Sequence, residues 1–329
     1  MRILEKSELE KNIQAFCKII WPENIKENLR NIIGLESQKQ LLKNIFIAGK
    51  KFRKLQKAGL NSNISALLYG PPGVGKTALT RAICRDQKSL IIDIQPSQIF
   101  ESYFGETLKN ITSLFKSIGE YSDIIYKKGY ITVLFIDEFD SLARERADPT
   151  EIGEMKRAVN EFLRCIDTLM YENHYLIIIA ATNHEFTLDS AVWRRFLYHI
   201  FFPLPTSEVR TSLLRFFFNN LVDLEPNINL KLDFNLLSEK LEGYSPSDIE
   251  RITRSIYVEF LSSNTNTEFL IDNEKIMNIA IYIGGIKDRL NLDHFKLKSK
   301  SNTKEKITTS NSISDLLRKE IEKTKKEGD

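Results

Sequence analysis

Residues 70–77 read Gly-Pro-Pro-Gly-Val-Gly-Lys-Thr, and this octapeptide constrains the chain more than any other stretch. It fits G-x-x-x-x-G-K-[ST], a pattern in which glycines let the backbone wrap closely around phosphates with its N–H groups pointing inward. A strand-like run at 64–69 precedes it and a helix-like run at 78–84 follows. This is the context that a phosphate-binding loop requires. Lys76 is expected to reach the β- and γ-phosphates of a nucleotide, and Thr77 to place its hydroxyl on Mg²⁺.

A second strand-like run, at 131–136, ends in two adjacent carboxylates, Asp137 and Glu138. In open parallel sheets, ligands bind at the carboxyl ends of the strands. Asp137 is therefore expected to hold Mg²⁺ through its water shell, and Glu138 to orient and polarise an attacking water. The plainer alternative is that two acids cap a strand and begin a turn. The phosphate loop earlier in the chain weakens that alternative.

Polar and basic residues follow the next apolar run, at 175–181. This run ends at Asn183, whose uncharged amide can hydrogen-bond both a γ-phosphate and the lytic water without competing for the metal. Arg194 and Arg195 come soon afterwards, behind a short apolar stretch. They are either a solvated helix end or arginine fingers that face the γ-phosphate of a neighbouring subunit.

Buried strands are also predicted at 90–94 and 200–203, and beyond Pro205 the pattern becomes helical. We therefore predict an α/β fold: a phosphate-loop NTPase with a five-stranded parallel sheet flanked by helices, followed by a small all-α lid domain. The expected division is an N-terminal helical segment at 1–31, a large α/β ATPase subdomain at 32–205, a helical lid at 206–295, and a basic, disordered tail at 296–329 that could form one short helix.

Charge and cysteine content exclude several classes of protein. The net charge is +3, and the tail at 296–329 contributes ten basic and six acidic residues, or +4, which leaves the body at −1. A nearly neutral body gives little support to nucleic-acid binding. The three cysteines have no metal-ligand spacing and indicate free thiols in a reducing cytosol. No signal peptide and no apolar run long enough to span a bilayer are present, so a cytoplasmic protein is expected.

The motifs together resemble an ATPase domain of the AAA family, within the AAA+ superfamily, over roughly residues 32–286. Residues 70–77 resemble its Walker A motif and residues 134–138 its Walker B motif. The stretches 177–183 and 188–196 together resemble the second region of homology that sets this family apart from other phosphate-loop proteins. Residues 243–248 resemble the start of the sensor-2 helix in its lid. The Arg-Arg-Phe form of the arginine motif is similar to katanin, spastin and several bacterial members.

The resemblance implies roles for further residues. Asn183 takes the sensor-1 role, and Arg194 and Arg195 act as arginine fingers on ATP bound in the next subunit, which implies a homohexameric ring. Ile33 and Gly34 resemble the segment whose backbone contacts adenine. Residues 101–106 resemble pore loop 1, in which Tyr103 grips substrate beside Phe104 and Gly105. Pro246 and Ser247 stand where the family usually has Gly-Ala against the nucleotide, so base or ribose contacts are expected to differ there.

The sequence thus predicts an ATP- and Mg²⁺-dependent ring ATPase that remodels, unfolds or disassembles protein substrates through a central pore. A nucleotide-dependent regulatory ATPase that controls a partner protein is the first alternative. A DNA-linked AAA+ ATPase, suggested by the lysines at 39–57 and in the tail, is the less favoured second. The predicted site residues are, for catalysis, Glu138, Asn183, Arg194 and Arg195; for nucleotide, Ile33, Gly34, Gly70, Pro71, Pro72, Gly73, Val74, Gly75, Lys76, Thr77, Ala78, Asp137, Pro246 and Ser247; for Mg²⁺, Thr77 and Asp137; and for the pore loop, Tyr103, Phe104 and Gly105.

Overall fold

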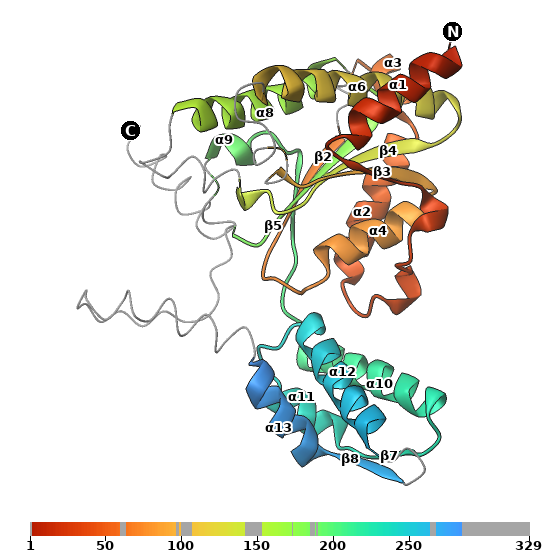
Figure 1. Ribbon diagram of the computed structural model, residues 1–329, viewed down its shortest axis with the longest axis vertical. Helices are drawn as coiled ribbons and strands as arrows, with labels where there is room; N and C mark the ends of the chain where they lie inside the picture. The colour runs from red at the N-terminus through yellow and green to blue at the C-terminus, as the bar shows by residue number, and fades with distance from the viewer. Residues whose placement is uncertain are drawn as a thin grey trace, which may run out of the picture. The chain divides into compact units, whose positions relative to one another are not determined.

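The computed structural model describes residues 2–59, 64–96, 99, 107–141, 153–172, 174–184, 188, 190–263 and 268–284. A six-stranded sheet with the order β1-β3-β4-β5-β2-β6 organises residues 2–204 (Figure 1). Its strands are β1 (Lys18–Ile20), β2 (Ile64–Tyr69), β3 (Ser89–Ile94), β4 (Ile131–Ile136), β5 (Leu176–Thr182) and β6 (Tyr198–Phe201). Strands β2 to β6 run parallel, and the positions of all five agree with the apolar runs in the sequence.

The sixth strand corrects the prediction of five. β1 pairs antiparallel with β3 at the sheet edge, with Lys18 opposite Asp93. The N-terminal segment is therefore helical only in part. Its three-residue strand was missed because a Lys-Ile-Ile run is too short to show an alternating pattern, and its pairing partner lies about seventy residues further along the chain.

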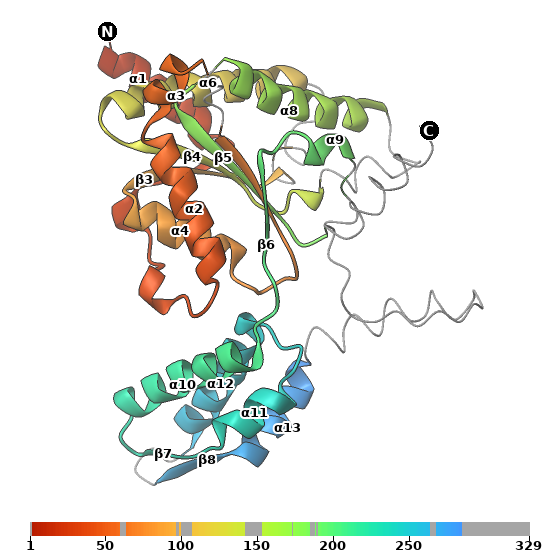
Figure 2. The ribbon, with the colours of Figure 1, turned by 180° about the vertical axis from the view of Figure 1, so that it is seen from behind.

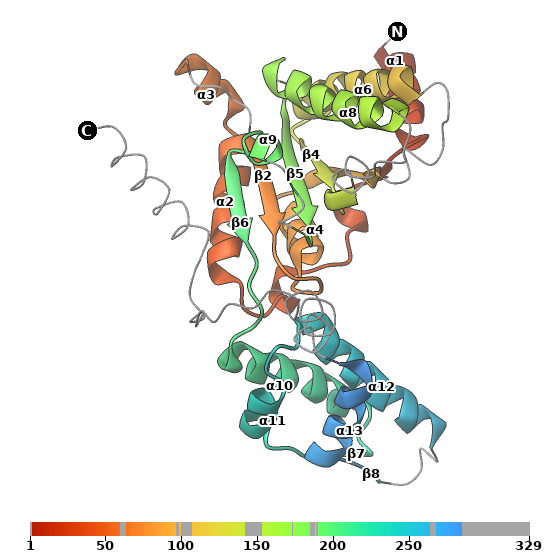
Figure 3. The same cartoon turned by 90° about the vertical axis from the view of Figure 1, so that its left-hand side faces the viewer.

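Helices cover both faces of the sheet, and the alternation of side chains along each strand determines which face a residue joins. Residues such as Ile91, Phe135 and Ile179 pack under α2 and α4, whereas their neighbours Ile92, Leu134 and Ile178 pack under α1, α6 and α8. Figure 3 shows the two helical layers on opposite sides of the strands. The helices of this part are α1 (Arg2–Gln14), α2 (Glu36–Gly49), α3 (Phe52–Lys57), α4 (Lys76–Asp86), α6 (Thr107–Lys127), α8 (Gly153–Tyr171) and α9 (Ser190–Trp193), with short 3-10 turns at η1 (Pro22–Asn24) and η2 (Leu29–Asn31).

The elements after β6 form a hydrophobic core of their own, which includes Leu214, Phe218, Ile252 and Phe260. Figure 2 labels these elements, which are α10 (Ser207–Leu224), β7 (Ile228–Lys231), α11 (Phe234–Lys240), α12 (Pro246–Ser262), β8 (Phe269–Asp272) and α13 (Asn273–Ile283). The expectation of an all-α lid was wrong in one respect, because β7 and β8 pair in parallel. Pro226 and the polar run at 262–267 do interrupt the helices before these strands, but four residues are too few to show the alternating pattern that reveals a strand. None of the described helices combines the length and apolar character needed to cross a bilayer.

His174, just before β5, ties this strand to helix α6. Its Nδ1 lies 2.9 Å from Oδ2 of Asp123, and its Nε2 lies 3.1 Å from Oε2 of Glu172. These carboxylates raise the pKa of His174, the hydrogen bond to Asp123 contributing most, although partial burial opposes them.

We expect the stability that His174 contributes to depend on pH. Because the folded pKa is raised, the contribution is complete below the unfolded value of about 6.5 and disappears as pH rises through the folded pKa. The difference in free energy of unfolding between wild type and His174→Gln, measured by urea denaturation, should therefore shrink as pH rises from about 5.5 to 8.5. A difference that does not change with pH would contradict this reading of the pair.

Candidate functional site

The phosphate loop connects β2 to α4, and three of its glycines have positive φ. The φ angles are 137° at Gly70, 75° at Gly73 and 100° at Gly75. A Cβ atom at Gly70 would lie 2.2 Å from the carbonyl oxygen of Phe202, so no other residue fits there without moving the backbone of the neighbouring strand. The remaining predicted loop residues also lie in this connection: Pro71 is in a bend directly after β2, Pro72 is in the turn that follows, Val74 is buried, and Ala78 lies in the first turn of α4.

Lys76 is buried, with 6% of its surface exposed, and its ammonium connects the loop to the end of β5. Its Nζ donates to the carbonyl oxygens of Gly70 and Pro71, at 2.7 and 2.8 Å, and to Oδ1 of Asn183 at 2.8 Å. The structure thus brings together Lys76 and Asn183, which lie 107 positions apart in the sequence. A buried cation beside a glycine loop and a helix N-terminus is suited to an anionic phosphate.

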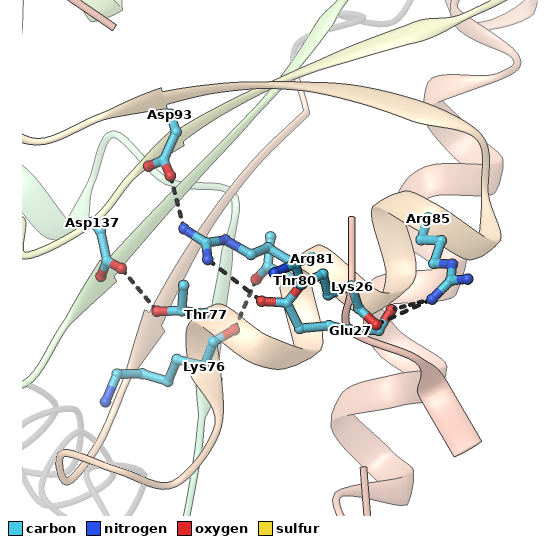
Figure 4. Close-up of polar contacts among 9 residues, drawn as sticks. All are labelled: Lys26, Glu27, Lys76, Thr77, Thr80, Arg81, Arg85, Asp93 and Asp137. Carbon is cyan, nitrogen blue, oxygen red and sulfur yellow. Dashed lines mark hydrogen bonds and ion pairs between the residues drawn. The ribbon is translucent and has the colours of Figure 1, made fainter. Parts of the chain in front are cut away.

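Thr77 and Asp137, the predicted metal ligands, also meet. The Thr77 hydroxyl donates to Oδ2 of Asp137 at 2.8 Å (Figure 4), while Oδ1 of Asp137 accepts from the backbone N–H of Glu138 at 3.0 Å. A hydroxyl and one carboxylate, with nucleotide phosphates supplying further oxygens, form the donor set that Mg²⁺ usually takes in such sites. These two residues therefore fit Mg²⁺.

Glu138 has an unusual backbone conformation. Its φ is +51°, in the left-handed region that costs a non-glycine residue energy. Its side chain is exposed at the carboxyl end of β4. A strained position beside Asp137, the predicted metal ligand, indicates that the local fold holds Glu138 in place for a task other than packing.

Asp140 is a site residue that the sequence did not reveal. It is 3% exposed, and its Oδ1 accepts from the Thr182 hydroxyl at 3.1 Å and from the backbone N–H of Asn183 at 3.3 Å. It therefore fixes the end of β5 that carries Asn183. The only sequence signal was a third acidic residue three positions after Asp137, which by itself indicates no particular role.

The two arginines differ in their surroundings. The Arg195 guanidinium pairs with Asp167 of α8, with its Nε 2.9 and 3.1 Å from the two carboxylate oxygens, and also donates to the carbonyl of Ala191. Arg194 is exposed, and its side chain forms no hydrogen bond or ion pair with another residue of the described part. Both lie on the turn between α9 and β6, and Asp167 is a partner that the sequence analysis missed.

The remaining predicted nucleotide contacts lie on two segments around the loop. The backbone N–H of Ser247 donates to the carbonyl of Gly73 at 3.2 Å, and a Cβ on Gly73 would lie 2.6 Å from Oγ of Ser245. The start of α12, including Pro246 at its first position, is thus in contact with the phosphate loop. Ile33 and Gly34 contact the elements after β6 instead. Ile33 packs against their hydrophobic core, and a Cβ on Gly34 would meet Val209. Tyr103, Phe104 and Gly105 lie outside the described residues.

Known proteins are similar to this chain in sequence and in fold. Residues 66–204 match the family described as "ATPase family associated with various cellular activities (AAA)". The chain is 32% identical over 242 residues to Cell division protein C of Sulfolobus acidocaldarius, across 73% of this chain and 61% of that protein. It is 31% identical over 256 residues to Vacuolar protein sorting-associated protein 4B of Mus musculus, across 78% of this chain and 54% of that protein.

A solved structure confirms the fold. The crystal structure of the FIGL-1 AAA domain matches with a TM-score of 0.64 and 23% identity, covering 89% of this chain and 94% of that one. The chain spans about half to three fifths of the length of the curated relatives, with coverage of 50%, 61% and 54%. The region 66–204 that matches the family contains both the phosphate loop and the strand that ends at Asp137 and Glu138. On this match and on the two relatives, the chain belongs to the AAA family of ATPases, within the AAA+ superfamily.

Proposed function

We propose that this chain is a Mg²⁺-dependent ATPase that works on protein substrates as a homohexameric ring in the cytoplasm. The observation that carries the proposal is the position of Lys76, buried between two loop carbonyls and Asn183 next to the Thr77–Asp137 pair. Lys76 and the loop N–H groups bind the phosphates, while Thr77 and Asp137 hold Mg²⁺, which neutralises charge on the phosphates. Glu138 orients the attacking water, and Asn183 hydrogen-bonds the γ-phosphate.

The ring assembly is supported by the difference between the two arginines. An exposed Arg194 with no partner in the described part is available to the nucleotide of a second copy, and such a cation stabilises the charge that develops in phosphoryl transfer. Arg195, anchored by Asp167, holds the turn from which Arg194 projects. On this proposal each active site is completed by the next subunit.

Action on a polypeptide is supported by Tyr103, Phe104 and Gly105, because an aromatic side chain can grip a chain without reading its sequence. One relative named above points the same way, since it is named for vacuolar protein sorting. The second candidate, a nucleotide-dependent regulator of a partner protein, has the same nucleotide site but would not respond to an unfolded polypeptide. DNA-linked action is the third, and predicts stimulation by DNA that weakens steeply with salt.

Steady-state ATP turnover, measured while an unfolded polypeptide or single-stranded DNA is added, tests the proposal. We expect turnover to rise with protein concentration, as a shared site requires, and to be stimulated by the polypeptide in wild type but not in Tyr103→Ala. Arg194→Ala should lower turnover by about a hundredfold or more, whereas Arg254→Ala, which removes an exposed arginine of α12, should not. Stimulation by DNA alone, or no response to either polymer, would contradict the remodelling function.

A further inference from the structure

One face of α4 carries three residues that are each one turn apart: Thr77, Arg81 and Arg85. Figure 4 shows them in a row, with partners on three different segments. Thr77 contacts Asp137, as described above. Arg81 reaches Asp93 of β3, with its Nη2 2.9 Å from Oδ2, and Arg85 donates to the carbonyl oxygens of Lys26 and Glu27 in the segment before α2.

Asp93 lies close to the predicted Mg²⁺ ligand for a reason of sheet geometry. β3 and β4 are parallel neighbours in which Asp93 is in register with Phe135, two residues before Asp137. Side chains two apart on a strand share a face, so Asp93 and Asp137 both point towards α4. The backbone N–H of Asp137 also donates to the carbonyl of Ile94 at 3.1 Å, which fixes the two strand ends together.

Charges on both sides act on the Asp93 carboxylate, whose side chain is only 10% exposed. Burial raises its pKa and so does the negative charge of Asp137, whereas the cations of Arg81 and Lys18 lower it. Lys18 is directly opposite Asp93 on β1, on the same face of the sheet. Asp93 is therefore a second, largely buried carboxylate beside Asp137, and its closest cation is Arg81.

Arg81 is itself held in place. Its Nη1 lies 3.4 Å from Oε1 of Glu27, so the guanidinium spans two carboxylates, on β3 and on the segment before α2. Both carboxylates raise the pKa of Arg81, Asp93 more than Glu27, against the effect of burial. The guanidinium consequently stays charged and its planar group stays aimed at Asp93.

We propose that Arg81 is a positioning residue of the Mg²⁺ site: it pairs with the Asp93 carboxylate, so that the Thr77 hydroxyl and the Asp137 carboxylate bind the cation without competition from β3. Without Arg81, Asp93 becomes an unpaired negative charge beside Asp137. An added carboxylate strengthens the attraction of a divalent cation but draws it away from the position that Thr77 and Asp137 define. The proposal rests on the proposed ATPase function.

Four variants of the full chain test this role: Arg81→Met, Arg81→Lys, Asp93→Asn and the double variant Arg81→Met/Asp93→Asn. Two quantities are measured for each. One is the affinity for a fluorescent ADP analogue in EDTA and over a Mg²⁺ titration. The other is kcat and KM for ATP. Arg254→Met is the matched control, because it breaks only an exposed ion pair with Glu250 on α12.

For Arg81→Met we expect the gain in ADP affinity on adding Mg²⁺ to grow by about threefold or more, and kcat to fall about tenfold with little change in KM. Arg81→Lys keeps the positive charge, so its Mg²⁺ response and its kcat should stay within about threefold of the wild-type values. Asp93→Asn alone should have a Mg²⁺ response and a kcat close to those of wild type. The double variant should regain both the wild-type Mg²⁺ response and most of kcat, because the unpaired carboxylate is gone.

Thermal unfolding of every variant shows whether a lost activity comes from an unfolded protein or from an altered Mg²⁺ site. If Arg81→Met does not fold, the comparison of Arg81→Lys and the double variant with wild type tests the positioning role. An unchanged Mg²⁺ response in Arg81→Met, or a double variant that stays as impaired as Arg81→Met, would overturn the positioning role. Wild-type protein that binds no ADP analogue would instead refute the proposed function, and this role with it.

Discussion

Glu138→Gln is expected to reduce ATP turnover by about 10²- to 10⁴-fold, the usual contribution of a positioned general base, while ATP still binds. Glutamine has the shape of glutamate and can adopt the same backbone conformation at φ +51°, but it cannot accept a proton from the attacking water. The contacts of Lys76, Thr77 and Asp137, the residues proposed to hold the phosphates and Mg²⁺, do not involve this side chain. Single-turnover hydrolysis and equilibrium binding of a fluorescent ATP analogue measure the two effects separately.

The matched control for this change is Glu239→Gln, which alters an exposed glutamate of α11, one of the helices after β6. It should leave both turnover and binding within about twofold of wild type. If Glu138→Gln kept turnover within about threefold of wild type, water activation would have to be assigned to another group. If it lost ATP binding as well, Glu138 would be part of the binding site and its strained backbone would serve that purpose.

The central part of the fold and of the site could be predicted because its signals are local. The octapeptide at 70–77 requires a strand before it and a helix after it. The apolar run at 131–136 ends where the carboxylates begin. The carboxyl ends of parallel strands share one edge of the sheet, so loop, Asp137 and Asn183 were expected together from topology alone. The contacts of Lys76 with Asn183 and of Thr77 with Asp137 confirm this.

What the sequence did not reveal depends on pairing between distant residues. Arg81 and Asp93 are ordinary charged residues until β3 and α4 place them 2.9 Å apart. The same is true of Arg195 and Asp167, which belong to different elements. β1 and the β7–β8 pair were missed because three or four residues carry too weak a pattern, and their pairing is decided by partners more than forty positions away. Sequence patterns therefore identified residues that meet at the carboxyl end of the sheet, but not the residues that hold them in position.

Lys76→Met is expected to weaken ATP binding by about 10²- to 10⁴-fold, because hydrogen bonds from a charged donor contribute about 1.5–3 kcal/mol each and Lys76 is expected to make two, to the β- and γ-phosphates. Methionine has a similar length and is apolar, so the buried space that Lys76 occupies stays filled. The two loop carbonyls and Oδ1 of Asn183 lose a donor. Equilibrium binding of a fluorescent ATP analogue in the presence of Mg²⁺ measures the loss.

The control for this change is Lys50→Met, because Lys50 is exposed at the end of α2 and its Nζ contacts a neutral partner, Gln87. It should bind ATP as wild type does. Asn183→Ala separates the two partners of the buried contact: it removes the amide that Lys76 contacts but keeps the cation, so binding should survive while hydrolysis falls. Binding by Lys76→Met within about threefold of wild type would mean that the loop N–H groups and Mg²⁺ alone hold the phosphates. The buried ammonium would then serve to fix Asn183 against the loop rather than to bind nucleotide.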